Sequence, residues 1–338
     1  MNGPISVTPF KVCVYLEHSN STYWSGGIRH AYENQVRALK RAGVDVTTDP
    51  SDEFDLLHLH SIGPYSLYLA ERISGRRPVL INSHVTAEDF ANSFRMSDQI
   101  APYLARYLRF FYAKADVLIA PSAYARDVLL RYALAQPIEV VSNGVDVTRF
   151  APNQDRRLVG RARYRLQDTV PFAVGWALLR KGVDLFVATG RLLPELTFMW
   201  FGRVHKAAKA GTLRAIAQAP DNVHFPGYVN DVRDAYAAGD IFFFPSTVEN
   251  EGIAILEAAA AGKPLVLRDA ECFADRFTHG VDCLKGTTPD EFADSLHQLV
   301  EDPVLYSRLA DGARRYAQRY SLERVGQRLR TIYEQLVH

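Results

Sequence analysis

Cysteine is scarce in this sequence, and its few cysteines form no pattern. Cys13, Cys272 and Cys283 are an odd number of residues at scattered positions. A disulfide framework or a structural zinc site needs cysteines in closely spaced sets, so the sequence predicts neither. We therefore expect free thiols in a reducing cytoplasm and no bound metal.

Long apolar runs are absent as well. No stretch reaches the 18 or so uninterrupted apolar residues that a membrane-spanning helix requires. The segment from Met1 to Phe10 lacks the basic start and apolar centre of a signal peptide. These absences predict a cytoplasmic protein that can meet a membrane only peripherally, on the inner face of the plasma membrane.

An excess of charge of one sign is also lacking. The 39 Lys and Arg residues nearly balance the 38 Asp and Glu residues, and the net charge of +1 argues against nucleic acid as the main partner. The first 165 residues have a small basic excess and the remainder a small acidic one. This asymmetry suits a first domain that meets an anionic surface.

Short apolar runs alternate with longer amphipathic ones along the whole chain. This pattern predicts an α/β protein of βαβ units with parallel sheets, and 338 residues are enough for two domains. The predicted strands are 12–16, 56–60, 79–82, 117–120 and 138–141 in the first half, then 172–174, 198–201, 223–225, 241–244 and 265–267. The main predicted helices are 28–42, 99–115, 184–192, 232–238, 253–261, 289–300 and 322–336.

An Arg-rich stretch around Pro152 interrupts this rhythm. We therefore predict one Rossmann-like domain over residues 1–160 and a second over residues 161–321. Ligands of open parallel sheets bind beyond the carboxyl ends of the strands. With two such sheets facing each other, the predicted site is the cleft between the domains.

The predicted helix at 253–261 carries the strongest functional signal. Glu249 lies in the loop before it, and Glu257 lies one turn inside it. The N–H groups at Gly252 and Ile253 have no intrahelical partners, so this helix start is an anion site. Glu257 stands among apolar residues, where a carboxylate needs donors such as sugar hydroxyls. The alternative is a core helix with one solvated glutamate.

Other short motifs follow predicted strands. Gly26 and Gly27 let a phosphate or sugar approach the backbone closely, although a plain turn has the same pattern. His84 follows the strand at 79–82, where a hydrogen-bonded loop histidine is the alternative. Arg180 and Lys181 precede a helix, where cations oppose the helix dipole, so they indicate an anionic partner.

Glu249, seven residues and Glu257, followed by an Ala-x-Gly-x-Pro ending at 260–264, resemble the Glu-x7-Glu signature of the family-4 retaining glycosyltransferases of the GT-B fold. The general resemblance runs from about Val12 to the C-terminus. It implies an acceptor-binding domain over 1–160 and a nucleotide-sugar-binding domain over 161–321. The last helix, 322–338, would cross back onto the first domain.

The resemblance also implies roles for single residues. Glu249 and His84 would lie beside the donor sugar, Glu257 would hold the ribose hydroxyls, and Lys181 would face the diphosphate. Arg180 would supply charge there, because Trp176 stands where the family usually has an arginine. The remaining residues expected to bind the donor are Gly26, Gly27, Arg203, Tyr228, Val229, Gly252 and Ile253.

Two positions depart from the family pattern or allow another role. Glu251 replaces an apolar residue of the family, and the ring of Tyr228 could pack in the core instead of lining the base. The cations and the helix N–H groups would stabilise the leaving diphosphate, and no cofactor is expected. The resemblance therefore implies metal-independent transfer from a nucleoside-diphosphate sugar.

Within the family, the chain looks most similar to the diacylglycerol and glycolipid glucosyltransferases. The predicted helix 99–115 supports a lipid acceptor independently, since it mixes five aromatic residues with three cations and no acid. Such a helix suits the membrane interface. The alternative is a helix buried against the first sheet with its arginines solvated.

Other functions remain open at this point. One is a family-4 enzyme that acts on a soluble sugar or glycan. Another is epimerisation of a nucleotide sugar, for which Glu249 has no evident acid–base partner in the first domain. A third is a non-catalytic nucleotide-sugar-binding protein. An NAD-binding Rossmann protein is disfavoured, because no Gly-x-Gly-x-x-Gly follows a strand.

Overall fold

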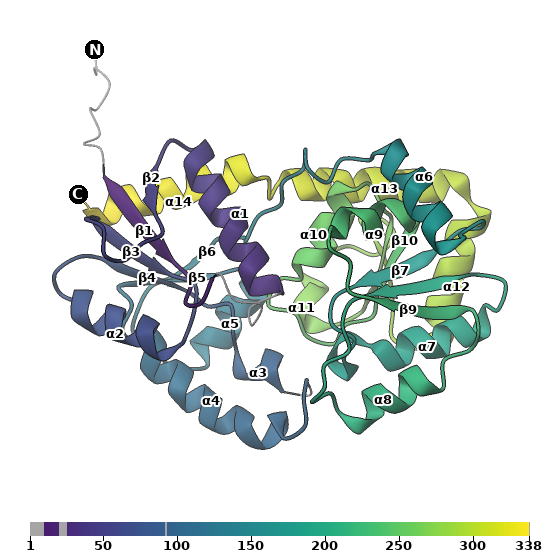
Figure 1. The fold of residues 1–338 in the computed structure, drawn as a ribbon, viewed down its shortest axis with the longest axis horizontal. Coiled ribbons are helices and arrows are strands. Elements are labelled where there is room, and N and C mark those ends of the chain that lie inside the picture. Colours follow the sequence, from purple (N-terminus) through teal and green to yellow (C-terminus); the bar gives the residue numbers. More distant parts are fainter. Residues whose placement is uncertain (1–9, 20–25, 92, 338) are drawn as a thin grey trace, which may run out of the picture. The chain divides into compact units, whose positions relative to one another are not determined.

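The computed structural model describes residues 10–19, 26–91 and 93–337. Most of the segment Met1–Phe10, for which no signal peptide is predicted, therefore lies outside the described residues. By their internal contacts the residues divide into two compact units (Figure 1). The first comprises Met1–Thr86, Tyr103–Gly144 and Tyr320–His338, and the second comprises Ala87–Pro102 and Val145–Arg319. The boundary expected at residue 160 falls inside a helix of the second unit, α6 (Gln154–Tyr164).

The first unit contains a parallel sheet of six strands in the order β2-β1-β3-β4-β5-β6. This confirms the α/β prediction. The short strand β2 was not predicted, because its sequence Asp-Val-Thr contains no apolar run. The strands are β1 (Lys11–Tyr15), β2 (Asp45–Thr47), β3 (Leu56–Leu59), β4 (Val79–Asn82), β5 (Val117–Ala120) and β6 (Ile138–Val140).

Helices pack on both faces of this sheet, and successive strand residues point to opposite faces. Val12 and Val14 belong to one apolar core with the helices α1 (Gly27–Arg41) and α14 (Leu322–Val337). Cys13 belongs to another core on the opposite face. The helices of that core are α2 (Pro64–Ile73), α4 (Ser97–Tyr112) and α5 (Ala123–Leu130).

The second unit also has a six-stranded parallel sheet, in the order β12-β11-β10-β7-β8-β9. Its core is rich in aromatic rings, among them Phe172, Trp200 and Phe243. The strands are β7 (Pro171–Val174), β8 (Phe198–Phe201), β9 (Val223–Gly227), β10 (Ile241–Phe244), β11 (Leu265–Arg268) and β12 (Leu284–Gly286).

The helices of the second unit include several that the sequence did not predict. α6 is one of them: Asn153 caps its first turn, but its many arginines hide any apolar stripe. Besides α6, the helices are α3 (Ala87–Phe90), α7 (Val183–Leu192), α8 (Ala210–Ala217), α9 (Val232–Ala238), α10 (Ile253–Ala260), α11 (Glu271–Ala274), α12 (Pro289–Glu301) and α13 (Pro303–Gln318).

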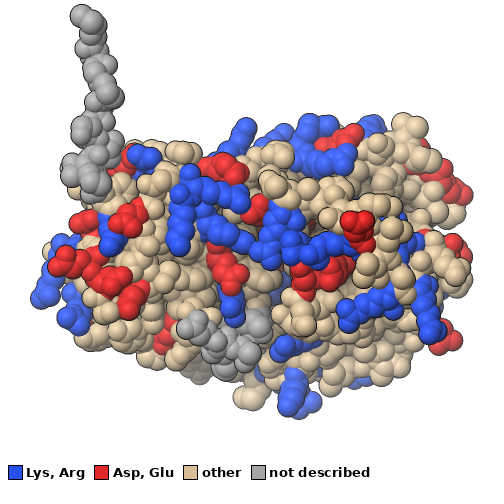
Figure 2. Space-filling view, turned by 45° about the horizontal axis from the view of Figure 1, so that its top comes forward, with Lys and Arg blue, Asp and Glu red and all other residues tan. Residues whose placement is uncertain are grey.

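Helix length and surface charge are two further features of the described residues. Throughout residues 10–19, 26–91 and 93–337, no helix has both the length and the apolar character needed to cross a bilayer. Figure 2 shows Lys and Arg gathered in clusters on one face, with Asp and Glu beside them. The near-zero net charge is therefore a mixture of both signs.

The strand order of each sheet reverses at one point. In the second sheet, β7 lies between β10 and β8, so the chain leaves β7 and β10 in opposite directions across the sheet. In the first sheet, the corresponding reversal lies between β1 and β3. Such points leave room for a ligand beyond the carboxyl ends of the strands. The predicted site residues of the second unit follow β7, β8, β9 and β10.

The C-terminal helix α14 belongs to the first unit, where it packs closely on α1. At Gly326 a Cβ atom would lie 2.1 Å from the carbonyl oxygen of Ala38. Real Cβ atoms do not approach a carbonyl oxygen so closely. Gly326 therefore permits the contact between these two helices.

We expect Gly326→Ala to destabilise the protein, although alanine is intrinsically the better helix former by about 1 kcal/mol. The added methyl group forces α14 away from α1, and such overpacking typically costs about 1–3 kcal/mol. Thermal unfolding of the full chain measures the effect. Gln327→Ala, at an exposed position of the same helix, is the matched control. An unchanged or raised Tm in Gly326→Ala would contradict the proposed contact.

Candidate functional site

The structure places the predicted site residues in two groups. Gly26, Gly27 and His84 belong to the first unit, whereas all the others belong to the second. The second group contains the two glutamates and the cations Arg180 and Lys181, so it carries most of the expected chemistry.

Lys181 is positioned by a tight turn after β7. Residues Leu179–Lys181 form one 3₁₀ turn, which ends at Gly182 with a φ of 76°. A Cβ atom at Gly182 would lie 2.2 Å from the carbonyl oxygen of Pro245, directly after β10. Only glycine fits this conformation and this approach. The turn thereby holds Lys181 against the segment that carries Glu249.

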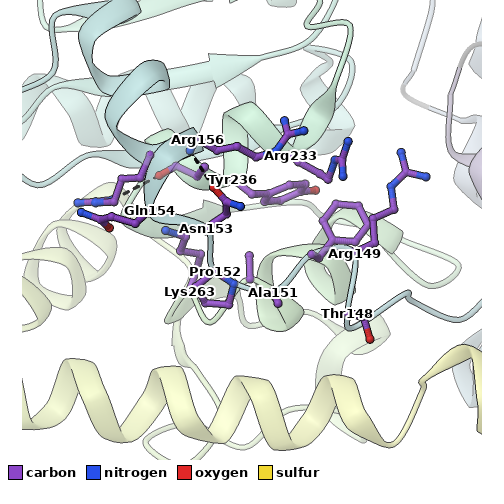
Figure 3. A pocket seen from close by; sticks show the side chains of 14 residues that line it. Thr148, Arg149, Ala151, Pro152, Asn153, Gln154, Arg156, Arg233, Tyr236 and Lys263 are labelled. Atoms are coloured by element: carbon purple, nitrogen blue, oxygen red, sulfur yellow. Dashed lines mark hydrogen bonds between the residues drawn. The ribbon is translucent and has the colours of Figure 1, made fainter.

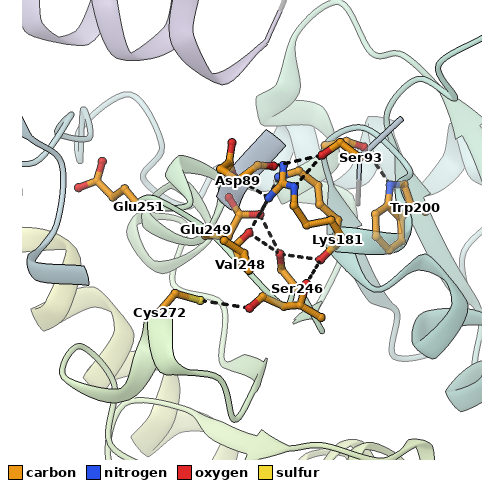
Figure 4. A network of polar contacts seen from close by, with 12 residues as sticks. Asp89, Ser93, Lys181, Trp200, Ser246, Val248, Glu249, Glu251 and Cys272 are labelled. Atoms are coloured by element: carbon orange, nitrogen blue, oxygen red, sulfur yellow. Dashed lines mark hydrogen bonds and ion pairs between the residues drawn. The ribbon is translucent and has the colours of Figure 1, made fainter. Parts of the chain in front are cut away.

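Glu249 is the centre of a buried polar network (Figure 4). Its side chain is only 9% exposed, and its Oε1 atom accepts hydrogen bonds from Lys181 Nζ at 2.8 Å and from Ser246 Oγ at 2.9 Å. Arg180 Nη1 lies 3.4 Å from the same oxygen. Within the described part of the chain, each hydrogen bond and ion pair of this carboxylate is made through Oε1. Oε2 is thus left to accept a hydrogen bond from a ligand.

The surroundings of Glu249 keep it ionised. Burial alone would raise the pKa of this carboxyl group, but the positive charges of Lys181 and Arg180 outweigh burial and lower the pKa below its ordinary value. Glu249 therefore presents a full negative charge at neutral pH. Such a charge can orient hydroxyl groups or oppose a developing positive charge.

Arg180 is enclosed by four partners. Its Nη1 atom contacts Asp89 Oδ1 at 2.8 Å and donates to the carbonyl oxygen of Val248 at 2.5 Å, and its Nε atom donates to Ser93 Oγ at 3.0 Å. With Glu249 as the fourth partner and a side chain only 8% exposed, Arg180 is a clamp for the surrounding segments. Lys181 is less enclosed, at 16% exposure.

Sequence reasoning missed Asp89 and Ser93. Both lie in the segment 87–102, which the chain inserts into the second unit between two portions of the first. Burial and the nearby charge of Glu249 raise the pKa of Asp89, while Arg180 opposes this shift. No motif marks these residues, because their role depends on a contact with Arg180 that is distant in sequence.

The start of helix α10 leaves its first N–H groups available. Gly252 precedes the helix with a φ of 77°, no side chain caps the first turn, and that turn contains no acid. Since the remainder of the helix is buried, its dipole acts at this end with little screening. Gly252 and Ile253 are both partly accessible. The structure thus leaves a helix N-terminus that suits an anion.

Glu257 is buried one turn inside α10, where the sequence placed it. It is 4% exposed, and Oε2 accepts a hydrogen bond from the hydroxyl of Tyr236 at 2.7 Å. Burial, with the charge of Glu257, raises the pKa of Tyr236 well above its ordinary value, so the phenol keeps its proton. Tyr236 is a third residue that sequence reasoning missed, and it orients the Glu257 carboxylate.

Arg203 and Tyr228 follow adjacent strands and lie against each other. The guanidinium carbon of Arg203 is 4.5 Å from the centre of the Tyr228 ring, and that ring is 54% exposed. The ring is therefore not part of the core, which was the alternative to a ligand contact. Val229 follows it and is partly accessible.

Trp176 and Glu251, which depart from the family pattern, have different surroundings. The ring of Trp176 stacks on His205 with centroids 5.0 Å apart, and the ring of Phe94 meets it edge-on at 5.9 Å. The Glu251 side chain points away from the polar network in Figure 4, and its backbone oxygen accepts a hydrogen bond from Arg276.

In the first unit, the half-buried His84 ends a chain that continues into the fully buried His60 and His58. His84 Nε2 lies 3.0 Å from His60 Nδ1, and His58 Nδ1 lies 2.6 Å from the hydroxyl of Tyr333 in α14. The His58 and His60 rings are 4.6 Å apart. Burial lowers the pKa of all three histidines, so they are neutral at pH 7. His84 can exchange hydrogen bonds with a ligand but cannot act as a cation there.

Gly26 and Gly27 stand at the start of α1. Gly26 is extended, and a Cβ atom at either glycine would meet nothing within 4 Å. Packing against the described residues therefore does not explain these glycines. An open approach to the backbone is what a phosphate or sugar needs.

The described residues include no group of three or more His, Cys, Asp or Glu side chains that could hold a metal ion. The cations and N–H groups around Glu249 are instead the means by which the protein itself can stabilise an anion.

Comparisons with known proteins place this arrangement among sugar-transferring enzymes. A model of the glycosyl transferases group 1 matches residues 161–316, and a model of Glycosyltransferase Family 4 matches residues 49–149. The processive diacylglycerol alpha-glucosyltransferase of Acholeplasma laidlawii is 30% identical over 97% of this chain and 98% of its own. The alpha-galactosylglucosyldiacylglycerol synthase of Streptococcus pneumoniae is 26% identical over 96% and 90%.

Solved structures share the fold. HepE from Anabaena, in complex with UDP and glucose, matches with a TM-score of 0.76 and 18% identity over 97% of this chain and 100% of that one. Sucrose-phosphate synthase from Thermosynechococcus elongatus matches with a TM-score of 0.76 and 17% identity over 97% and 99%.

We expect Arg180→Met to destabilise the protein by about 3–5 kcal/mol at pH 7, because it leaves two buried carboxylates without their shared cation. Protonation of Asp89 and Glu249 relieves the repulsion between their charges. The difference in the free energy of unfolding between Arg180→Met and the wild type should therefore narrow as the pH falls towards 4. Chemical denaturation at several pH values measures it.

The double variant Arg180→Met/Asp89→Asn should regain part of the stability lost in Arg180→Met. Lys209→Met, which removes an ion pair with the half-exposed Asp98, should cost less than about 1 kcal/mol. A loss in Arg180→Met no larger than this control would show that the clamp is absent.

Proposed function

The chain belongs to the family-4 glycosyltransferases of the GT-B fold, and on this basis we propose that it is a retaining hexosyltransferase acting on lipid. It moves a hexose, glucose, from a UDP-sugar to an acceptor such as diacylglycerol or glucosyl-diacylglycerol. The observation that carries the proposal is the ionised, buried Glu249 bound to Lys181.

The bond to be broken joins the sugar to the diphosphate. Negative charge therefore grows on the leaving group, and positive character grows on the sugar ring. Lys181 and the N–H groups of Gly252 and Ile253 stabilise the leaving diphosphate, so the reaction proceeds without a metal. When Lys181 turns to the diphosphate, Arg180 remains within 3.4 Å of Glu249 and keeps that carboxylate ionised.

The two glutamates hold the two sugars of the donor. Glu249 offers Oε2 to a hydroxyl of the transferred sugar and opposes the positive ring. Glu257, held by Tyr236, accepts the ribose hydroxyls, while Arg203 and Tyr228 flank the base. Retention then follows from attack on the face that the diphosphate leaves, with the leaving phosphate taking the acceptor proton.

The relatives support a lipid acceptor. The A. laidlawii and S. pneumoniae proteins are named for diacylglycerol glycolipids, and both align with almost the whole chain. Sequence similarity on this scale carries the reaction class more securely than the acceptor. Support for a lipid acceptor must therefore also come from the surface of the protein.

Helix α4 provides a surface that suits a lipid acceptor. It buries Leu108, Phe111 and Tyr112 against the first sheet, yet it leaves Tyr103 77% exposed and Phe110 49% exposed. Arg106 and Arg109 are exposed on the same helix. Tyr107 does not join this face, because its hydroxyl donates to the carbonyl oxygen of Ile62. The helix thus has one face in the core and an aromatic, basic face outward, which supports the proposed membrane contact.

The neighbouring helix α2 extends this face. Tyr65 and Tyr68 are each about half exposed, with ring centres 5.7 Å apart, and Arg72 is exposed beside them. An ion pair at 3.0 Å joins Glu71 of α2 to Lys114, which lies just after the end of α4. Aromatic rings beside cations are typical of surfaces that bind the headgroup region of a membrane. We propose that the enzyme meets its acceptor through this face.

The acceptor test is a panel of nucleotide sugars, each offered diacylglycerol, glucosyl-diacylglycerol, soluble glycans or water, with the products identified by mass and anomeric configuration. We expect transfer from a UDP-hexose to the lipids with an α linkage. Transfer to soluble glycans alone would favour a soluble acceptor instead. An absence of transfer from every donor would sink the proposed activity.

Within the same panel, Lys181→Ala should lower kcat by about 10²–10³, since it removes a cation that acts on the leaving diphosphate. Glu257→Ala should instead weaken nucleotide binding. Lys209→Ala, a surface lysine of the same unit, is the matched control and should retain wild-type kcat. If all three variants behaved alike, the assigned roles would be wrong.

Membrane contact is tested by flotation with vesicles. We expect binding that increases with the fraction of anionic lipid and falls as salt screens the charges. Arg106→Glu/Arg109→Glu should reduce it, whereas Arg308→Glu/Arg315→Glu, on the exposed side of α13, should not. Equal flotation with neutral and anionic vesicles would count against the proposed face.

A further inference from the structure

The second unit contains a cationic cavity that the proposed transfer reaction does not use. The cavity has a volume of about 470 Å³ and lies between the loop before α6, the first turns of α6, helix α9 and the end of α10. Of the described residues that line it, none is Asp or Glu, but five are cations (Figure 3). They are Arg149, Arg156, Arg157, Arg233 and Lys263.

Three carboxylates stand behind the arginines rather than in the cavity. Asp231 pairs with both Arg156, at 3.1 Å, and Arg233, at 2.5 Å. Asp234 also pairs with Arg156. These acids hold the arginine side chains in place, which gives the cavity a fixed wall of N–H donors.

The third carboxylate, Asp240, is shared as well. It pairs with Arg157 at 2.6 Å and with Arg161, which does not line the cavity, at 2.8 Å. Three acids thus balance six cations, so the region has a positive excess. A positive excess around a cavity favours an anion, because each cation lacking a partner gains from a charge-assisted hydrogen bond.

Two of the lining cations have no carboxylate partner among the described residues. Arg149 is exposed, and within the described part of the chain its side chain makes no hydrogen bond or ion pair. Lys263 Nζ donates to the carbonyl oxygen of Gly239 at 2.7 Å. Burial, with the charges of Arg157 and Arg161, lowers the pKa of Lys263 to about 8 against the opposing effect of Asp240. In Figure 3 Arg149 and Lys263 stand on different sides of the cavity.

We propose that this cavity binds the phosphate group of a small phosphate monoester. Arginine forks and a lysine are the residues that best match phosphate oxygens. The cavity is much larger than a phosphate ion, and Phe150, Pro152 and Ala237 give it an apolar wall. That wall fits the organic part of an ester. The site is separate from Lys181 and Glu249, so it does not depend on the proposed transfer reaction.

The cavity shares one side chain with the candidate donor site. The ring of Tyr236 lines the cavity and meets the Phe150 ring edge-on at 5.6 Å, while its hydroxyl holds Glu257. A phosphate monoester bound in the cavity would therefore contact the residue that orients Glu257.

The test is a calorimetric titration of the full chain with inorganic phosphate and with glycerol 3-phosphate. We expect Arg149→Glu to weaken binding of both probes at least tenfold, and Lys263→Gln to weaken it similarly. Arg149→Glu carries the test if Lys263→Gln fails to fold, since the Arg149 side chain holds no partner. Arg308→Glu makes the same charge change on α13 and should bind as the wild type does.

Lys181→Ala distinguishes the cavity from the donor site. Phosphate binding that survives this variant and is lost in Arg149→Glu supports the proposal. Binding that is lost in Lys181→Ala and kept in Arg149→Glu would place the anion in the donor site and overturn it. Tighter binding of glycerol 3-phosphate than of inorganic phosphate supports an ester as the ligand, and equal binding contradicts that part.

Discussion

The second unit is organised around one buried carboxylate that must stay ionised. Glu249 is 7% exposed, and a charge in such surroundings is unfavourable unless cations and hydrogen bonds compensate it. Lys181 and Arg180 provide the charge, and Asp89 balances the second cation. Before any ligand binds, the four side chains form a nearly neutral cluster. In the proposed transfer, Lys181, the less enclosed of the two cations, is the one that turns to the diphosphate.

The scaffold explains why these groups meet. Both sheets are parallel, and the second reverses its strand order between β7 and β10. The turn after β7 carries Arg180 and Lys181, and the loop after β10 carries Glu249, so the reversal brings charges from two distant segments together. Gly182 allows the two segments to touch. Helix α10 then adds its N-terminus to the same edge of the sheet.

The segment 87–102 contacts Trp176, the main departure from the family pattern, and contains Asp89, which the sequence analysis did not predict. Trp176, in the place of an arginine, packs with Phe94 and His205. Phe94 belongs to the same segment as Asp89, so this aromatic cluster holds the segment where Asp89 meets Arg180. A cation is missing at residue 176, and the nearby Arg180 is committed to a structural role. The proposed function therefore assigns binding of the diphosphate to Lys181 and the α10 N-terminus.

The sequence by itself determined the parallel α/β architecture, most strands, and the positions of Glu249, Glu257 and Lys181 relative to their own helices. These features depend on local patterns: apolar runs, glycine at turns, and the spacing of two acids about one helix start. Only the tertiary structure decided which side chains hold them. Asp89, Ser93 and Tyr236 lie far in sequence from the residues they bind, so no spacing reveals them. The Arg-rich α6 and the two faces of α4 were likewise decided by packing, because burial depends on what the rest of the chain places beside a helix.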